Sequence, residues 1–196
     1  MNCLADLLPL FGFVFFGLFS PGPNVILLTA SGARFGFRRT VPHLLGVALG
    51  VGITAGFTGL GIGVLLLAQP VLTTVLKIGA TVWILWMAYR LWHADPAQTK
   101  KRDRPFTFLE AVLFQWINPK VWAVAISAMA YVAALSPVDQ AVMMAATFSG
   151  LNLSVCLFWT TAGTLLSFLL GNPLAWRSFM RVMAVALAAF SALIFL

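Results

Sequence analysis

The sequence predicts an all-α integral membrane protein whose six transmembrane helices form two inverted three-helix repeats. Apolar residues fill 61% of the 196 positions and charged residues only 9%, and the mean hydropathy is +0.99. A typical soluble domain is about 25% charged. Uncharged stretches recur at roughly the 20-residue length that spans a bilayer. Because lipid cannot satisfy an exposed backbone, and barrel strands would alternate in polarity, these stretches are expected to be helices.

Polar and turn-forming residues separate the predicted spans. Clear breaks fall at Ala33–Thr40, which holds three arginines, at the polar segment His93–Arg104, and at the turn Gly171-Asn172-Pro173. Two weaker breaks fall at Gln69-Pro70 and Ser136-Pro137. The expected spans are residues 4–31, 41–68, 71–92, 109–134, 140–168 and 177–196.

Basic residues are concentrated in three alternate connections, which hold ten of the twelve lysines and arginines. Under the positive-inside rule these connections face the cytoplasm, and both termini lie on the outer, periplasmic side. The sixth span then crosses only if Arg177 and Arg181 snorkel to the interface. The net charge of +7 is therefore interpreted as membrane topology, with the lipid bilayer as partner and no nucleic acid.

Each half of the chain opens with a span that is interrupted near its centre. The interruptions are Ser20-Pro21-Gly22-Pro23-Asn24 in the first span and Asn118-Pro119-Lys120 in the fourth. Because each half has three spans, the second half begins on the opposite side of the membrane, as in many secondary transporters. We expect one transporter domain over residues 1–196. It comprises a first repeat at about 4–92, a cytoplasmic loop at about 93–108 and a second repeat at about 109–196.

The first interruption exposes backbone carbonyls at membrane depth. Pro21 and Pro23 have no amide hydrogen, so the carbonyls of Gly17 and Phe19 lose their helical donors, and Gly22 eases the unwinding. Lipid cannot satisfy such carbonyls. They are expected to face protein, water or a ligand.

The second interruption has the chemistry of an anion site. Asn118 is expected to cap a new helix that begins at Pro119, which leaves free amides at the positive end of the helix dipole. Lys120 follows near the bilayer centre, where a lysine costs on the order of 2.5 to 3.5 kcal/mol. A proline kink used only for packing, with Lys120 bonded to a carbonyl, is the alternative. The two motifs give the predicted binding residues Pro21, Gly22, Pro23, Asn24, Asn118, Pro119 and Lys120.

Other polar residues in the spans have two interpretations each. Lys77 could belong to the site or snorkel outward from the third span. Asn24, Gln115 and Asn152 could line a cavity or form hydrogen bonds between helices. The glycines of the second span, from Gly46 to Gly63, favour close helix packing.

Taken together, these motifs identify a family resemblance. Along nearly its whole length the chain resembles the LysE/RhtB family of amino-acid exporters. The shared marks are the two interrupted motifs, the segment Gly32–Arg39 before a glycine-rich span, and Leu76–Ala80. The approach Phe114–Asn118 is most similar to the branch that includes cysteine and O-acetylserine exporters. One departure is the absence of proline from Ala128–Ala134, where many members have Pro-Gln-Phe, and this leaves the substrate open.

The resemblance implies outward transport of amino acids or close derivatives across the bacterial cytoplasmic (inner) membrane, driven by protons. It implies no catalytic residue, no metal and no cofactor, and homo-oligomerisation is left open. The two broken helices are expected to face each other and to hold a zwitterion by alternating access. No acidic residue lies at mid-membrane to carry the proton, so Lys120 or His43 remains as the group that could titrate.

Two other functions are weighed against transport. A transmembrane thiol-redox relay would need paired cysteines at the breaks, and neither break has one. A non-transporting membrane assembly subunit would tolerate substitution of Lys120.

Overall fold

The computed structural model is mostly helical over the residues that it describes, which are 3–20, 22–62, 68–93, 104–169 and 172–193. No strand occurs among these residues. The elements are α1 (Cys3–Phe19), α2 (Pro23–Phe35), α3 (Phe37–Gly59), α5 (Pro70–Trp92), α6 (Phe108–Ile117), α7 (Pro119–Ala128), the 3-10 helix η1 (Met129–Tyr131), α8 (Pro137–Leu169) and α9 (Pro173–Leu193).

The predicted spans match these helices in part: α3 ends at Gly59, before the expected residue 68, and α9 begins at Pro173, before the expected residue 177. The spans at 71–92 and 140–168 correspond to α5 and α8 within three residues. The break expected over residues 33–40 is wrong in extent, because α2 runs to Phe35 and α3 starts at Phe37. Only Gly36 interrupts the two helices, and its φ of 79° is a conformation that glycine adopts without strain.

The arginines around Gly36 explain why the helices continue so far. The guanidiniums of Arg34 and Arg39 lie 5.2 and 5.6 Å from the centroid of the Phe35 ring. An arginine stacked on an aromatic ring is stabilised by cation–π attraction, so it can be accommodated on a helix as well as in a loop. A charged segment therefore looked like a connection in the sequence although most of it is helical.

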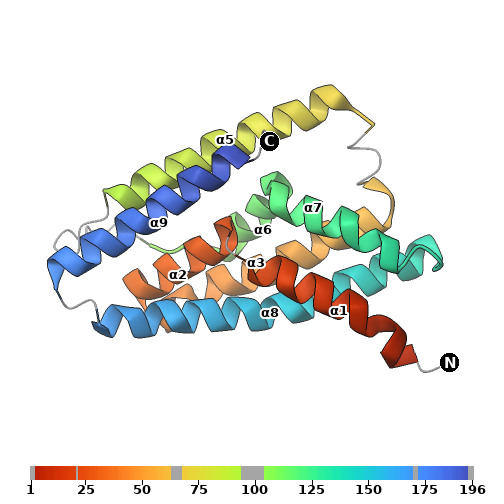
Figure 1. Ribbon diagram of the computed structural model, residues 1–196, viewed down its shortest axis with the longest axis horizontal. Coiled ribbons are helices and arrows are strands. Elements are labelled where there is room, and N and C mark those ends of the chain that lie inside the picture. The colour runs from red at the N-terminus through yellow and green to blue at the C-terminus, as the bar shows by residue number, and fades with distance from the viewer. Residues whose placement is uncertain (1–2, 21, 63–67, 94–103, 170–171, 194–196) are drawn as a thin grey trace.

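Two layers of helices make up the molecule (Figure 1). The larger layer contains α1, α2, α3, α6, α7 and α8, and within it α8 packs on α2 and α3 while α6 packs on α3. The antiparallel pair of α5 and α9 lies beside it and touches the larger layer mainly through α2 and α6. Buried apolar residues join the two layers: Ile26 and Leu27 of α2 belong to the same cluster as Met87 and Met180.

Glycine packing holds the larger layer together, as the sequence predicted for α3. A Cβ atom built on Gly46 or Gly59 would come within 3 Å of backbone atoms of α6 or α8. Gly32 of α2 and Gly163 of α8 are equally tight, since each lies against the backbone of the other's helix. Small residues at these positions allow the helix axes to approach closely.

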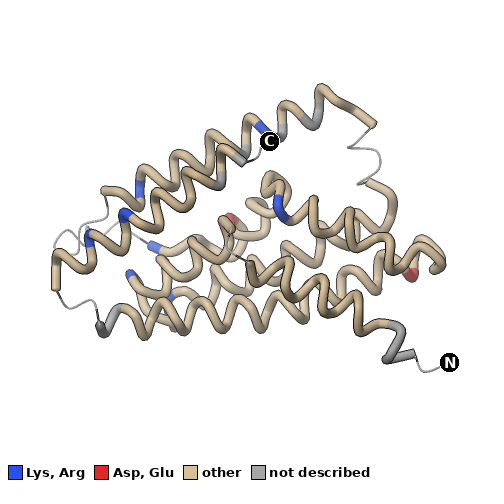
Figure 2. Tube along the Cα trace, in the orientation of Figure 1, with Lys and Arg blue, Asp and Glu red and all other residues tan. Residues whose placement is uncertain are grey.

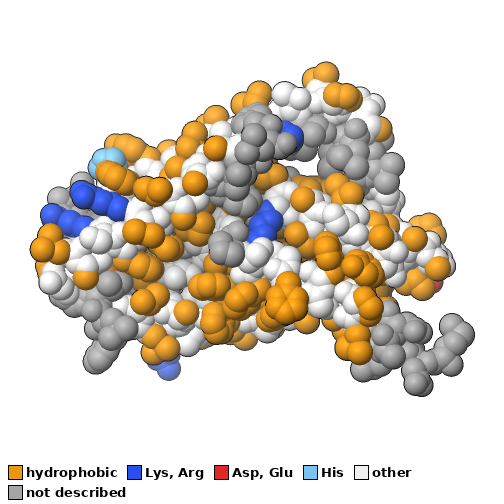
Figure 3. All heavy atoms as spheres, viewed as in Figure 1, with side chains coloured by type: hydrophobic (Ala, Val, Ile, Leu, Met, Phe, Trp, Pro, Cys, Tyr) orange, Lys and Arg blue, Asp and Glu red, His pale blue; other side chains and the backbone are white. Residues whose placement is uncertain are grey.

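Membrane-spanning length can be assessed for part of the chain. Within the described residues, α3 and residues 137–166 of α8 are each long and apolar enough to cross a bilayer. Residues 7–19 and 23–35 together make a third candidate span, bent by 57° at the break. Hydrophobic side chains cover much of the visible face (Figure 3), and lysines and arginines gather toward one end of the molecule (Figure 2).

Candidate functional site at two helix breaks

The two breaks meet inside the larger layer. The Nζ atom of Lys120, at the start of α7, donates a hydrogen bond to the carbonyl oxygen of Ser20, at the end of α1. Gly22 lies directly beneath this side chain, and a Cβ atom there would come 2.7 Å from Lys120 Cδ. The ammonium of one half of the chain thus closes onto the backbone of the other half.

The second break forms as the sequence predicted. Asn118 has an extended backbone (φ −82°, ψ 103°), and α7 begins at Pro119. One expectation is corrected, however, because the first amides of α7 are not free. The amide of Lys120 donates to Asn118 Oδ1 at 3.3 Å, and the amide of Val121 donates to the Asn118 carbonyl at 3.1 Å. The positive charge that the site offers therefore comes mainly from the Lys120 ammonium.

The first break differs from the expectation in one carbonyl. The Ser20 hydroxyl donates to the carbonyl of Gly17 at 2.9 Å, so this carbonyl already accepts one hydrogen bond. The acceptor that meets Lys120 belongs to Ser20, which the sequence reasoning missed. The sequence did contain the signal. In an unbroken helix the Ser20 carbonyl would accept from the Asn24 amide, but a new helix that starts at Pro23 places this amide in its first turn, away from Ser20. Pro21 itself lies outside the described residues.

Three side-chain amides form a network beside the break. Asn24 Nδ2 donates to Gln115 Oε1 at 2.8 Å, and Gln115 Nε2 donates back to Asn24 Oδ1 at 3.2 Å. Asn118 Nδ2 reaches the same Gln115 oxygen at 3.4 Å. Gln115 is fully buried, and burying its polar side-chain atoms without partners would cost free energy, so these hydrogen bonds stabilise its position. Asn24 and Gln115 form a direct link between the two halves of the chain.

A small cavity opens between the breaks and brings together five of the ten predicted residues. Gly22, Asn24, Asn118, Lys120 and Asn152 line it, with apolar walls from Leu18, Val25 and Val121. It has room for about one water molecule, which is too little for an amino acid. A ligand of that size would require the two breaks to separate.

The remaining predicted residues lie elsewhere. Pro23 and Pro119 begin α2 and α7 and do not line the cavity. Lys77 is on α5, in the other layer, and is not among the lining residues either. Asn152 serves both predicted roles, since it lines the cavity and its Nδ2 donates to the carbonyl of Val47 at 3.4 Å.

Comparison with known proteins now decides the family. The family model described as LysE type translocator matches residues 15–196. The chain belongs to the LysE-type translocator family. This membership confirms the resemblance seen in the sequence, and members of this family are efflux transporters and not enzymes.

Curated relatives of this LysE-type translocator are efflux proteins. It is 27% identical over 111 residues to a cysteine/O-acetylserine efflux protein of Salmonella paratyphi A, covering 56% of each chain. It is 28% identical over 108 residues to a homoserine/homoserine lactone efflux protein of Salmonella typhimurium, covering 52% of each. The chain thus spans about half the length of the curated relatives it matches. No solved structure matches it.

Proposed function

We propose that this chain exports amino acids or close derivatives from the cytoplasm across the bacterial cytoplasmic membrane. The observation that carries the proposal is the contact between the Lys120 ammonium and the Ser20 carbonyl across two helix breaks. Efflux activity in two differently named relatives supports the direction and the substrate class.

A zwitterion is the ligand that fits this contact. If an amino acid enters between Lys120 and Ser20, its α-carboxylate pairs with the ammonium and its α-ammonium pairs with the carbonyl. Both protein groups then exchange one partner for another of the same kind, so neither is left unsatisfied. Asn24 Oδ1 lies beside the break and provides a second acceptor for the α-ammonium. A simple anion or cation would satisfy only one of the two groups.

Transport requires the breaks to part and close again. The cavity is too small for an amino acid, so the structure corresponds to a closed arrangement of the site. Equivalent helices of the two halves pack on each other, α3 with α8 and α5 with α9. That pairing supports inverted repeats related by a pseudo-twofold axis, and alternating access would come from movement of the segments around the two breaks. The six-span count and the outward placement of both termini belong to the same proposal.

Lys120→Ala tests the function directly. Cells with and without the gene are loaded with cysteine, O-acetylserine, threonine, homoserine or lysine, and the amino acid accumulating outside is measured. We expect Lys120→Ala to lower efflux at least about tenfold, because a charged hydrogen bond to the substrate is lost. Ser127→Ala changes an exposed residue two turns further along α7 and is the matched control. Wild-type efflux by a correctly inserted Lys120→Ala protein would contradict the proposal.

Proton coupling is a separate part of the proposal. Neither Asp139 nor Glu110 lines the break cavity, so no described carboxylate serves it as a proton relay. Lys120 and His43 are the two groups that we propose could titrate in its place. A protonophore that abolishes efflux at constant substrate load would support coupling, and unchanged efflux would exclude it.

A further inference from the structure

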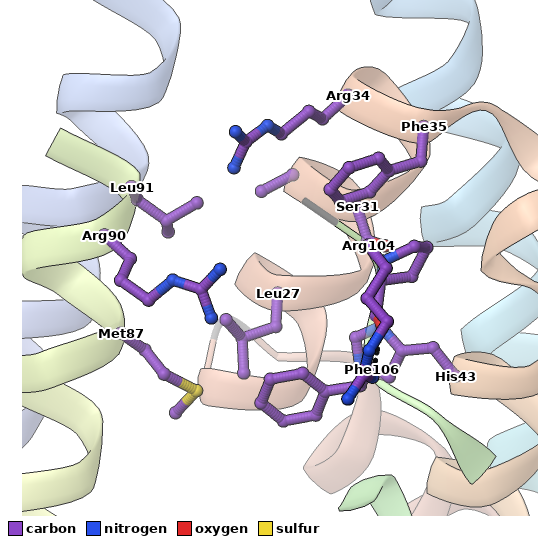
Figure 4. A pocket seen from close by; sticks show the side chains of 12 residues that line it. Leu27, Ser31, Arg34, Phe35, His43, Met87, Arg90, Leu91, Arg104 and Phe106 are labelled. Atoms are coloured by element: carbon purple, nitrogen blue, oxygen red, sulfur yellow. Dashed lines mark hydrogen bonds between the residues drawn. The ribbon is translucent and has the colours of Figure 1, made fainter. Parts of the chain in front are cut away.

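Two spaces border helix α2: the break cavity, and a larger pocket between the two layers (Figure 4). They share no lining residue. In the larger pocket, Arg34 is stacked on Phe35 at 5.2 Å from the ring centroid. Arg90 is stacked in the same way on Trp86 at 5.0 Å. The break cavity differs from this pocket, because a buried amide beside it keeps an acceptor that no described residue uses.

Three asparagines line the break cavity, and two of them have both ends of the amide paired. Asn24 exchanges two hydrogen bonds with Gln115, at 2.8 and 3.2 Å. Asn118 Oδ1 accepts from the amide of Lys120 at 3.3 Å, and Asn118 Nδ2 donates to Gln115 at 3.4 Å. These two side chains are therefore occupied in joining the segments around the breaks.

Asn152 of α8 is the third asparagine, and only one end of its amide is paired. The residue is 2% exposed, and its Nδ2 donates to the carbonyl of Val47 at 3.4 Å. Because a carbonyl can only accept, this bond decides which end of the amide is the nitrogen, and Oδ1 is the end left for the cavity. Oδ1 accepts no hydrogen bond from any described residue. Buried polar atoms nearly always have a partner, so this oxygen indicates a group that donates to it.

A ligand can reach this oxygen. Some polar side-chain atoms in the described part of the chain are fully enclosed and have no partner, and they belong to His43, Trp159, Thr160 and Trp176. Asn152 Oδ1 is not one of them, so it retains accessible surface although the residue as a whole is buried. The cavity that Asn152 lines is the space from which that surface is reached.

Helix α8 holds Asn152 on a wall that the breaks do not form. The other lining residues all belong to the two broken spans. Around Asn152, α8 packs closely on α3, since a Cβ atom built on Gly52 would come within 3 Å of Ser149, one turn before Asn152. The position of Asn152 thus depends on the contact between α3 and α8. It remains a fixed wall of the site when the breaks separate.

The chemistry of the cavity limits the side chain that can meet Asn152. Lys120 lines the cavity and no described carboxylate does, so a cationic side chain would be buried without a counter-charge. Leu18, Val25 and Val121 supply apolar walls. The free space fits about one water molecule, and a hydroxyl group has about this size. A short, uncharged side chain that ends in a donor fits both the space and the oxygen.

We infer that Asn152 determines substrate specificity by accepting a hydrogen bond from a hydroxyl or thiol at the end of a short, uncharged side chain. The inference rests on the proposed export function and extends it. Lys120 and the Ser20 carbonyl bind the zwitterion that all amino acids share, and Asn152 contacts the part that differs. An analogue without the donor leaves the buried oxygen unpartnered, and this is the arrangement that discriminates strongly between isosteres.

A pair of isosteric amino acids tests the assignment. Norvaline has the shape of homoserine, with a methyl group in place of the hydroxyl. Uptake of each radiolabelled amino acid into inside-out membrane vesicles gives its kcat/KM, and the homoserine-to-norvaline ratio does not depend on how much protein is folded. We expect a ratio of about tenfold or more for wild type and close to one or below it for Asn152→Leu, because the hydrogen bond to the hydroxyl is lost.

Ser154→Ala is the matched control for this ratio. Ser154 is an exposed residue of α8 outside the cavity, and its substitution is expected to leave the wild-type ratio unchanged. The same ratio in wild type and in Asn152→Leu would overturn the inference.

Asn152→Asp tests the assignment through a gain of transport, which misfolding cannot produce. The substitution keeps the size of the side chain and adds a negative charge. 2,4-Diaminobutyrate has an ammonium where homoserine has its hydroxyl, and wild type is expected to transport it poorly. We expect the variant to transport it several-fold better, because the carboxylate supplies the counter-charge. Unchanged exclusion of 2,4-diaminobutyrate would show that residue 152 does not face the substrate side chain.

Binding to the purified protein separates this inference from the proposed function. A ligand that binds the folded protein raises its melting temperature. At equal concentration, homoserine is expected to raise the melting temperature of detergent-solubilised wild type more than norvaline does, and the difference is expected to disappear in Asn152→Leu. This preference in a protein that transports neither amino acid would refute export and retain the role of Asn152. Transport of both amino acids without the preference would refute the role of Asn152 alone.

Discussion

At the scale of single residues, Gly22 determines how closely Lys120 can approach the first break. The glycine is buried under the lysine side chain, and any Cβ atom would lie 2.7 Å from Cδ and 2.9 Å from Nζ. Its backbone is extended (φ −175°, ψ 179°), so other residues can adopt its conformation. Steric exclusion, and not backbone freedom, is the reason for glycine at this position.

We therefore expect Gly22→Ala to displace Lys120 from the Ser20 carbonyl and to lower efflux about tenfold. The atoms in the way are the far end of the flexible Lys120 side chain, which moves aside at little cost to folding, so the loss falls on its contact with Ser20, where about 1.4 kcal/mol is tenfold. Efflux of the substrate identified for wild type is the measurement, with membrane levels of the protein matched. Gly12→Ala, where no atom lies within 4 Å of the new Cβ, is the control and is expected to retain efflux. Equal efflux by the two variants would show that the position of Lys120 does not matter.

The residues of the site were predictable to different degrees. Asn118, Pro119 and Lys120 follow local rules of helix capping, and their positions agree with the sequence. The carbonyl of Ser20 and the pairing of Asn24 with Gln115 depend on contacts 100 and 91 residues apart, which no local pattern contains. Lys77, like Lys120, is a lysine within a predicted apolar span, but it lies in the other layer. Depth in the membrane can be read from a sequence, whereas the direction a lysine faces depends on the packing of its helix.

At the scale of elements, close contact between α2 and α8 fixes how the first broken span is held. Gly32 lies against the backbone of Thr160, and Gly163 lies against the backbone of Thr29, so the two helices touch through main-chain atoms. The hydroxyl of Thr164 donates to the carbonyl of Gly32 at 3.3 Å and reinforces the contact. Movement of α2 during transport would have to carry this part of α8 with it.

Gly163→Ala is expected to destabilise the protein. The added Cβ would come within 3 Å of backbone atoms of Thr29, which cannot rotate away as a side chain can. We expect a loss of about 1–3 kcal/mol, seen as a lower melting temperature of the detergent-solubilised protein. Gly150→Ala, also on α8 with open space around its Cβ, is the matched control and should be neutral or slightly stabilising. A melting temperature for Gly163→Ala at or above that of Gly150→Ala would show that the helices are not held at this distance.

The helices themselves were largely predictable, since each long apolar stretch among the described residues is helical. Errors concern their ends. The turn at Gly36 was hidden among arginines that remain helical by stacking on Phe35. The start of α6 combines Thr107, whose hydroxyl accepts from the amide of Glu110 at 3.2 Å, with Arg104. The hydrogen bond from Glu110 raises the pKa of Arg104 above its ordinary value. The capping box of Thr107 and Glu110 starts α6 at Phe108, one residue before the predicted span.

At the scale of the whole molecule, the break cavity lies where the two halves of the chain meet. The halves are interleaved, since α8 of the second half packs on α2 and α3 of the first. Relative movement of the segments around the two breaks would change the size of this cavity while leaving the helices intact. This arrangement is suited to a protein that must open a site on alternate sides of a membrane.

The proposed direction of export and the inverted repeats both depend on the orientation of the chain in the membrane. Lysines and arginines gather toward one end of the molecule (Figure 2). If that end is cytoplasmic, both termini lie outside and the two halves have opposite orientations, as inverted repeats require.

Alkaline phosphatase, which is active only outside the cytoplasm, is fused after Arg104, after Ser136 and after Leu196. We expect activity from the second and third fusions and none from the first. An inactive fusion after Leu196 together with an active one after Ser136 would place the C-terminus in the cytoplasm, which gives the second half an even number of crossings in place of three. Such a result would remove the inverted relation between the halves and with it the symmetry proposed for the site.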